Sequence, residues 1–574
     1  MLRMKYFVLS FVLAALSAGC ATPPQKESVV GDYLTGRFAA NTNEIDAAAT
    51  AFDGVKLDGS DSDQLLRSAF FYKLAAGKID GATQFVGKIL ENDDPEDDDL
   101  ARLALAARAL KAGDYAQVRS ILVAEPAVDY FSGLMTIIDA WAADGLKGPE
   151  AALKILAVQD AEMFRGFHPL HQAFLFEALG LNDEARTAYQ LSLMAYGGSV
   201  ARDAYGLFLE RTGDLETARQ HYELLAQYPG PDRQVALHGL ARLASGKRAR
   251  NWTPVEPARG AAFALYSFGS AILQQTVDQR SAAEDAGFRV GPPNYDTPLA
   301  FTQIALYLDP TLDHAQRLAG AILNTYGDSE NAIAMLKRIP ATSAFYEVAQ
   351  IEIASGFLAL DRKDDAMSVL RTAAKPKGAT EARFAYGNLL TGEARHREAV
   401  SVYSDLIDAL PEDPAEDTWR YFVARAASLV EINNWPQAEA DLKRAVEISP
   451  EEPTALNYLG YSWAERGENL DEAFALIEKA VAIEPNSGAY IDSLGWAHFQ
   501  RGEYEMAVGH LEHAASLEAS DPTITDHLGD VYWRLGRETE ARYQWRRVLE
   551  LEPSDELRAS AALKLKEGLP EAAE

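Results

Sequence analysis

The sequence is nearly devoid of cysteine, since Cys20 is the only one among 574 residues. A chain with one cysteine cannot form an internal disulfide, so its stability has to come from packing. Positive charge is also scarce, because 54 Lys and Arg residues stand against 85 Asp and Glu residues, giving a net charge of -31. This charge repels phosphate groups, and it argues against nucleic acid and against an anionic bilayer surface as binding partners.

The usual signatures of catalysis and of metal binding are missing as well. The sequence contains no H-E-x-x-H, no Walker phosphate loop, no G-x-G-x-x-G and no G-x-S-x-G. Its one histidine cluster consists of His498, His510, His513 and His527. His510 and His513 lie one turn apart on an expected helix and could hold a metal, but no carboxylate or cysteine completes the set. We therefore expect no metal ion, no cofactor and no enzymatic activity.

Long hydrophobic runs are absent apart from one near the N-terminus. A short basic head, MLRMK, precedes the apolar run Tyr6 to Ser17, which is too short to span a bilayer comfortably. The run leads to LSAGC, which ends at Cys20 and resembles a bacterial lipobox, although Leu16 lies one place further out than usual. The resemblance implies a signal peptide over 1–19, a lipid on Cys20 and a tether over 20–30. The alternative is an ordinary signal peptide followed by an incidental free thiol.

A sequence motif near the C-terminus recurs at regular intervals. Gly460, Gly495 and Gly529 are separated by 35 and 34 residues, and seven residues after each stands another glycine, at 467, 502 and 536. Alanines follow at fixed offsets, and prolines close two of the units. These features match the tetratricopeptide repeat, whose period is 34 residues and whose unit is a pair of helices, A and B. Four units are defined in this way: 419–452, 453–487, 488–521 and 522–555.

Each glycine of a unit has a separate physical role. The first allows helix A to approach its partner helix closely, and the second ends helix A with a positive φ. The same pattern extends upstream with lower fidelity, for example at Gly206, Gly320 and Gly387. The sequence therefore predicts an all-α superhelix, or solenoid, of roughly fourteen helix pairs.

One segment does not follow the repeat period, and we use it to divide the chain into expected regions. The stretch 276–298 is too long for a turn between helices and contains Pro292-Pro293, which predicts an inserted loop. We expect a divergent N-terminal arm over 31–260, an irregular repeat with this loop over 261–312, and C-terminal repeats over 313–555. A capping helix and tail, stopped at Gly568 and Pro570, should follow over 556–574.

The repeat register also predicts a binding site. In such arrays particular positions of helix A line a concave groove, and in the last three units these positions hold many aromatic and acidic residues. Aromatic side chains offer apolar area to a partner, and carboxylates beside them favour basic or amide-rich partners. Trp496 and Trp533 have a second interpretation, as packing between repeats. The predicted groove residues are Asn457, Tyr458, Tyr461, Asp492, Trp496, Phe499, Asp526, His527, Asp530, Trp533 and Arg534.

The repeats from ALNYLGYSWAERG at Ala455 to the end of the array, together with the lipobox and the length, resemble a family of bacterial tetratricopeptide lipoproteins. Its members are outer-membrane adaptors for a periplasmic carboxyl-terminal processing protease. The resemblance implies a non-catalytic scaffold that faces the periplasm, recruits or activates such a protease or its substrates, and touches the membrane only through its lipid. Ala21 after the cysteine agrees with sorting to the outer membrane. An assembly or secretion factor for outer-membrane proteins or polysaccharide remains the alternative, and an enzyme with repeats attached is the weaker one.

Overall fold

The structure is a computed structural model in which helices are the only regular secondary structure of the described residues. It describes residues 29–570 apart from 53–62, 92–94, 124–128, 158–165, 196–197, 228–229, 248–255, 287, 289, 292, 376–378 and 413. Cys20 and the expected signal peptide lie outside this part of the chain. The chain divides into two compact units, Met1–Ala366 and Met367–Glu574.

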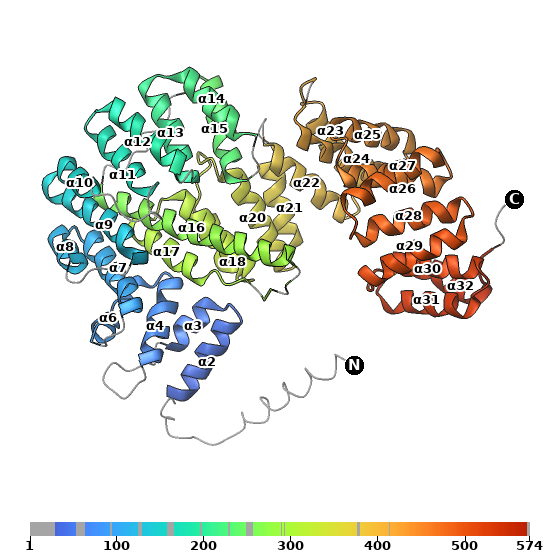
Figure 1. Cartoon of the computed structure of the whole chain (residues 1–574), viewed down its shortest axis with the longest axis horizontal. Coiled ribbons are helices and arrows are strands. Elements are labelled where there is room, and N and C mark those ends of the chain that lie inside the picture. The colour runs from blue at the N-terminus through green and yellow to red at the C-terminus, as the bar shows by residue number, and fades with distance from the viewer. Residues whose placement is uncertain are drawn as a thin grey trace. The chain divides into compact units, whose positions relative to one another are not determined.

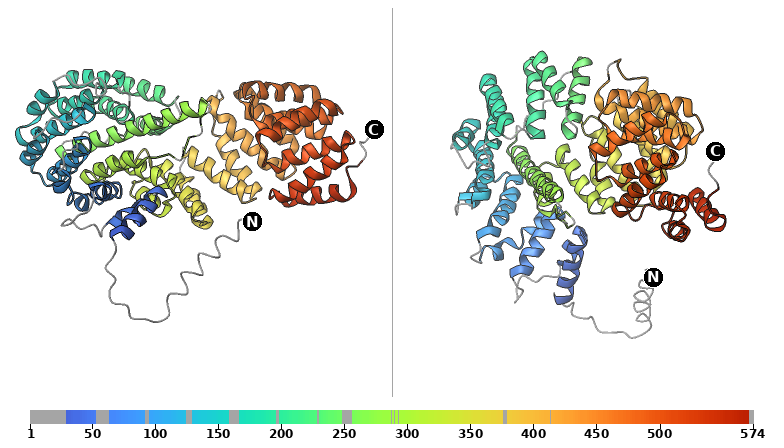
Figure 2. Two further views of the ribbon diagram at one scale, coloured as in Figure 1. Left: turned by 60° about the horizontal axis from the view of Figure 1, so that its bottom comes forward. Right: turned by 45° about the vertical axis from the view of Figure 1, so that its right-hand side comes forward.

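Unit 1 begins with a curved run of antiparallel helices (Figures 1 and 2). Consecutive helices pack on one another along this run, as in a solenoid. Its helices are α2 Val29–Asn41, α3 Ile45–Ala51, α4 Asp63–Ala75, α5 Ile79–Ala82, α6 Val86–Ile89, α7 Pro95–Lys111, α8 Tyr115–Val123, α9 Asp129–Lys147, α10 Pro149–Leu156, α11 Phe167–Ala178, α12 Asn182–Ala195, α13 Ser199–Thr212, α14 Leu215–Leu225 and α15 Pro231–Ala244.

The chain then turns back along the inner side of this curve (Figure 2). The long helix α16 packs on α7, α9 and α11, and α17 packs on α4 and α7. Segments such as Ala261–Leu265 and Leu299–Phe301 are buried on all sides, as expected for helices placed in the middle of a unit. The inner face of the first run is therefore covered by the chain itself. The returning helices are α16 Pro257–Asp285, α17 Asp296–Leu308, α18 Asp313–Thr325, α19 Ser329–Leu336 and α20 Tyr346–Ala359.

The structure corrects the expected organisation of this region in two respects. Thr276–Asp285 is the end of α16 and not a loop, because the sequence there holds no helix breaker and an i,i+4 ion pair joins Arg280 to Glu284. The connection to α17 is confined to the residues between Asp285 and Asp296. In addition, residues 313–366 belong to unit 1, so the stretch 313–555 expected to hold the C-terminal repeats spans both compact units.

Unit 2 is a regular array of helix pairs. The four units expected from the repeat pitch correspond to α24 with α25, α26 with α27, α28 with α29, and α30 with α31. Helix α21 Lys363–Ala373 crosses the boundary between the compact units. The further elements are α22 Thr380–Gly392, α23 His396–Ile407, η3 Glu416–Thr418, α24 Trp419–Glu431, α25 Trp435–Ile448, α26 Pro453–Arg466, α27 Leu470–Ile483, α28 Gly488–Gln500, α29 Tyr504–Leu517, α30 Pro522–Arg534, α31 Glu538–Glu550 and α32 Asp555–Glu567.

The two predicted glycine roles are confirmed. The second glycine of each repeated motif has a positive φ, at 67° for Gly467, 77° for Gly502 and 75° for Gly536. The first lies against a large side chain about half a repeat further along the chain, so that a Cβ atom would come within 2.5–2.7 Å of it. These contacts, which also occur upstream, are Gly206 with Tyr222, Gly320 with Leu336, Gly460 with Ile477, Gly495 with Leu511 and Gly529 with Trp545.

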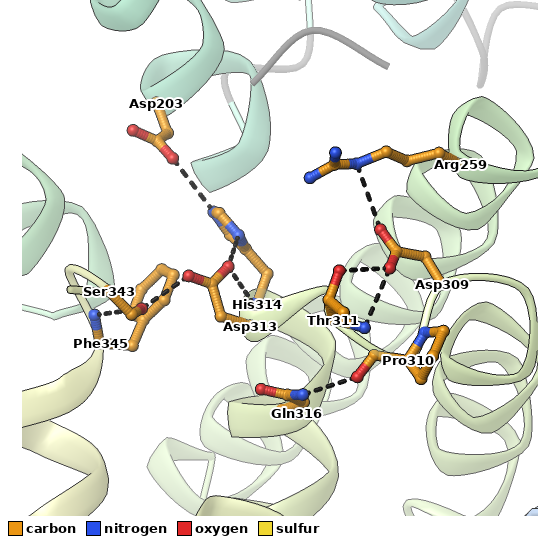
Figure 3. A network of polar contacts seen from close by, with 10 residues as sticks. All are labelled: Asp203, Arg259, Asp309, Pro310, Thr311, Asp313, His314, Gln316, Ser343 and Phe345. Carbon is orange, nitrogen blue, oxygen red and sulfur yellow. Dashed lines mark hydrogen bonds and ion pairs between the residues drawn. The ribbon is translucent and has the colours of Figure 1, made fainter. Parts of the chain in front are cut away.

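A buried polar network fixes the returning helices of unit 1 to its first run (Figure 3). His314, at the start of α18, is 2% exposed and directs Nδ1 to Asp313 at 3.1 Å and Nε2 to Asp203 of α13 at 3.7 Å. Burial alone would lower the pKa of His314, but the two carboxylates outweigh it and raise the pKa. Burial raises the pKa of Asp203 to about 6, although His314 opposes this. His314 thus bridges two helices that lie far apart in the sequence.

We predict that substituting Gly460 with alanine destabilises the helix pair α26–α27 by about 1–3 kcal/mol. The added Cβ would lie 2.8 Å from the Ala473 carbonyl oxygen and 2.7 Å from the Ile477 side chain, and backbone atoms cannot move away cheaply. Hydrogen exchange of α26 and α27 measures the change. The matched control is Gly509→Ala in α29, which meets no atom within 4 Å and should be neutral or stabilising by up to about 1 kcal/mol. Equal effects of the two substitutions would contradict the close-approach role.

The polar network predicts how the stability of unit 1 depends on pH. Groups whose pKa is raised on folding contribute stability at low pH and lose it as the pH rises through the folded pKa, and both His314 and Asp203 are of this kind. The opening free energy of α13 and α18, from hydrogen exchange corrected for intrinsic rates, should therefore fall between about pH 4 and about pH 6 as Asp203 ionises. It should fall again above about pH 6.5 as His314 loses its proton. The variant His314→Gln should show a flatter profile. An unchanged profile in this variant would assign the pH dependence to other groups.

Candidate functional site

The predicted groove residues occupy one shared face of three consecutive A helices, here called the A-helix face. Asn457, Tyr458 and Tyr461 lie on α26, and Asp492, Trp496 and Phe499 lie on α28. Asp526, His527, Asp530, Trp533 and Arg534 lie on α30. Contacts between α26 and α28, and between α28 and α30, bring side chains of neighbouring repeats together.

Aromatic rings are stacked across this face. Trp496 lies parallel to Phe499 with ring centroids 4.7 Å apart, and His527 stacks on Trp496 at 4.0 Å. Tyr461 continues the row at 6.5 Å from His527. Trp496, Phe499 and Tyr461 are partly exposed, and the buried Nε1 atom of Trp496 has no hydrogen-bond acceptor among the described residues. The stack therefore presents apolar surface.

Asp492 is neutralised by the histidine of the next repeat. Its carboxylate accepts from His527 Nδ1 at 2.9 Å, and both side chains are more than nine-tenths buried. Burial lowers the pKa of His527, but Asp492 and the further carboxylates Asp530 and Asp526 outweigh burial and raise it. The raised pKa favours the charged form of His527 beside Asp492.

The carboxylates of α30 are neutralised by the capping helix. Lys564 of α32 donates from Nζ to Asp526 and to Asp530, at 2.7 Å each, and Trp545 Nε1 donates to Asp530 at 2.9 Å. Asp526 is 5% exposed and Asp530 is 4% exposed. The expectation that these acids and Asp492 lie between the aromatics as accessible groove charges is therefore wrong. Burial of a carboxylate requires a partner, and the chain supplies each one from the next repeat.

Trp533 differs from Trp496 in its surroundings. Its ring lies 5.4 Å from that of Trp545, Arg542 lies over it at 5.1 Å, and Gly568 at the end of α32 packs directly against it. For Trp533 the structure thus favours packing between the last repeat and the cap. Arg534, beside it, has a buried Nε without a partner among the described residues.

Lys564 was not anticipated from the sequence, although a signal for it exists. It follows Asp526 and Asp530 by about one repeat, the same spacing that separates Asp492 from His527. Ion pairs at this spacing recur elsewhere, between Glu177 and Arg211 and between Arg317 and Glu352. A search for opposite charges one repeat apart would have identified it.

The remaining histidines form no metal centre in the part of the chain that the structure describes. His498 Nδ1 pairs with Glu503 at 2.6 Å, and its ring stacks on His510 with centroids 5.3 Å apart. Nearby His498 and His513 add to the burial that lowers the pKa of His510. Among the described helices, none has the length and apolar character needed to cross a membrane.

The comparison with protein families agrees with this geometry. Residues 423–488 and 493–556 match the tetratricopeptide-repeat family model. These segments are tetratricopeptide repeats. The match confirms the expected fold class, an all-α tetratricopeptide-repeat solenoid, which as a fold typically provides an extended surface for binding other proteins.

Solved structures with similar chains share little sequence with this one. A chain of the APC/C hetero-tetramer Cut9–Hcn1 is 15% identical with a TM-score of 0.37, over 95% of this chain and 97% of that one. A tetratricopeptide repeat protein from Parabacteroides merdae ATCC 43184 is 14% identical with a TM-score of 0.37, over 44% and 97%. MamA is 18% identical with a TM-score of 0.25, over 34% and 98%. No curated protein sequence matches the chain.

We predict that Lys564→Gln destabilises the terminal repeat by about 3 kcal/mol, because it leaves two buried carboxylates without a counter-ion. Hydrogen exchange of α30, α31 and α32 should increase while that of α26 stays unchanged. The control is Lys566→Gln, two residues further on, whose side chain is 79% exposed and should contribute almost nothing. Similar exchange in the two variants would show that Lys564 is not needed to hold the cap.

Proposed function

We propose that the chain is a non-catalytic protein-binding scaffold and that the A-helix face of unit 2 holds its partner. The observation that carries this proposal is the row of partly exposed rings formed by Tyr461, Trp496 and Phe499 around His527. Stacked, internally supported aromatics lose little side-chain entropy when a partner covers them, so they are effective anchors.

Unit 1 supports this choice of surface. The inner side of its first run, where an open solenoid would offer a concave binding face, is covered by α16 and α17. The A helices of the C-terminal repeats carry no comparable returning segment within unit 2. Within the described part of the chain, unit 2 is therefore the better candidate for holding an extended partner.

The proposal extends to location and partner. In it, Cys20 carries a lipid that anchors the chain to the periplasmic side of a bacterial outer membrane, and the partner is a periplasmic carboxyl-terminal processing protease or its substrate. The support is the lipobox-like LSAGC ending at Cys20 and the resemblance of the repeats to adaptor lipoproteins. The acidic charge of -31 is consistent with the absence of nucleic acid and of direct headgroup contact. An assembly or secretion factor would share the anchor and the scaffold and would differ only in its partner.

Site-specific photocrosslinking in intact cells tests the proposed surface. The photoreactive p-benzoylphenylalanine replaces Tyr461 on the A-helix face or, as the matched control, Tyr543 on helix B of the last repeat, which is 59% exposed. We expect a specific crosslink from position 461 and none of the same mass from position 543, because only the former is covered by a partner. A crosslink from 543 alone, or none from 461, would contradict the proposal.

The same cells distinguish the finer parts of the proposal. Mass spectrometry of the crosslinked species should identify a carboxyl-terminal processing protease or its substrate, and an outer-membrane assembly component would support the alternative instead. The N-terminal peptide should begin at an acylated Cys20, and Cys20→Ala should abolish the lipid and release the chain from the membrane fraction. An unmodified Cys20 in the wild type would exclude the anchor without affecting the scaffold.

A further inference from the structure

His527 supplies the ring of the A-helix face that can change its charge near neutral pH. It lies inside the aromatic row, stacked on Trp496 with ring centroids 4.0 Å apart and ring planes 15° apart. Trp496 stacks in turn on Phe499, with ring planes 8° apart. His527 is 6% exposed, whereas Trp496 is partly exposed. The histidine therefore supports the indole ring to which we assign partner binding.

Asp492 fixes the orientation of this histidine. Both of its carboxylate oxygens lie within hydrogen-bond distance of His527 Nδ1, at 3.0 Å and 2.9 Å. An ionised carboxylate only accepts hydrogen bonds, so Nδ1 donates in the neutral and in the charged imidazole alike. Because Asp492 belongs to α28 and His527 to α30, this contact joins two neighbouring repeats. The plane of the imidazole, and with it the stacking on Trp496, therefore depends on the pair.

Several charges surround His527. Asp492 faces it from α28, and Asp526 and Asp530 act on it from α30 itself. Lys564 of α32 pairs with Asp526 and with Asp530 at 2.7 Å each, which leaves Asp492 to His527. Burial lowers the pKa of His527, but Asp492, Asp530 and Asp526 outweigh burial and raise it. The negative charge around the ring therefore favours its charged form.

Titratable groups of three other helices complete the surroundings of α30. Tyr461 of α26 faces His527 with an uncharged ring 6.5 Å away, and Glu465 of the same helix acts on Tyr461. Glu512 of α29 pairs with an arginine at 3.4 Å. Arg542 of α31 lies over a tryptophan ring at 5.1 Å. Among the described residues, the α28 carboxylate is therefore the ion-pair partner of His527.

Loss of the proton from His527 weakens this arrangement in two ways. A charged imidazole is attracted to the face of an indole ring, and a neutral imidazole lacks this attraction. The carboxylate of Asp492, which is 5% exposed, also loses its counter-charge, and an uncompensated buried charge is costly. We therefore expect the contact between α28 and α30 to relax, so that Trp496 loses the support that fixes its ring.

We propose that His527 is the positioning residue of the A-helix face and makes partner binding dependent on pH. In its charged form it holds Trp496 in the orientation that receives the partner, and loss of the proton releases the ring. The proposal rests on the proposed function and specifies how that site is regulated. Because protonation and partner binding favour the same state, each strengthens the other, and binding takes up protons. The partner is held most tightly while His527 is charged, and its affinity falls as the pH rises.

Fluorine NMR of the full chain labelled with 5-fluorotryptophan tests the positioning of Trp496 without a partner. We expect its resonance, assigned by its loss in Trp496→Phe, to shift as the pH rises from about 6 to about 9. The shift should be absent in His527→Gln, and in Asp492→Asn its midpoint should move to lower pH, because the nearest carboxylate is gone. The control His513→Gln removes an exposed histidine of α29 and should leave the shift unchanged. Circular dichroism confirms that each variant is folded.

A peptide probe tests the effect on binding. It is selected at about pH 6 from a phage-displayed library of random decapeptides on the purified full chain, and it is kept only when Trp496→Ala abolishes its binding. It is acetylated at its N-terminus and contains no histidine or cysteine, so it does not itself titrate near neutral pH. Its affinity should fall about tenfold between about pH 6 and about pH 9, and the fall should vanish in His527→Gln. Calorimetry in buffers of different ionisation enthalpy should show proton uptake on binding.

The outcomes separate this regulation from the scaffold function. A Trp496 resonance that is independent of pH, or that shifts equally in His527→Gln, would overturn the positioning role. A peptide that depends on Trp496 and binds equally tightly across this pH range would overturn the regulation and leave the scaffold standing. The same fall in affinity in His527→Gln would assign the pH dependence to other groups, and His314→Gln controls for those of unit 1. A selection without any peptide sensitive to Trp496→Ala would contradict the proposed function together with its regulation.

Discussion

The close contact between a glycine of helix A and a large side chain of helix B determines how the helices of each pair cross. At Gly206, Gly495 and Gly529 the space that a Cβ would occupy is filled by Tyr222, Leu511 and Trp545. These side chains are among the most buried of the chain, so the glycine and its partner together form the centre of the pair. Because a pair cannot cover its remaining apolar faces, its geometry also fixes how the next pair stacks on it. Successive helix pairs therefore stack on one another with the same geometry.

The stacking of neighbouring pairs also buries polar side chains of the A helices, and these side chains require partners. The chain meets this requirement with charges of opposite sign about one repeat apart, such as Asp492 with His527 and Arg317 with Glu352. At the end of the array, where no further repeat exists, Lys564 of the capping helix takes this role. A buried ion pair adds little to stability compared with an apolar contact, but removing one partner is costly. The main consequence of such a pair is therefore the destabilisation that follows when one partner is lost.

The two units use the solenoid in different ways. In unit 1 the chain returns through the inside of its own curve, and contacts distant in the sequence close the unit, including Asp203 with His314 and Asp80 with Tyr307. In unit 2 the A helices keep partly exposed aromatic rings that stack on one another. A surface that is covered by other helices of its own unit contributes to stability. Exposed rings that are held in place by their neighbours are suited to binding a partner. This difference is the reason why we propose the recognition role for the second unit.

The sequence by itself determined the fold class, the register of the four C-terminal repeats and the roles of their glycines. These features could be predicted because they depend on contacts within one repeat, and such contacts recur at a fixed period. It also identified which residues share the A-helix face, but not which of them are available. Only the tertiary structure decided that Asp526 and Asp530 are neutralised by Lys564, and that Trp533 is packed against the cap. It alone decided that α16 extends to Asp285 inside the first run and that unit 1 ends at Ala366. The physical reason is that burial and neutralisation depend on side chains brought together from distant segments, which no local period encodes.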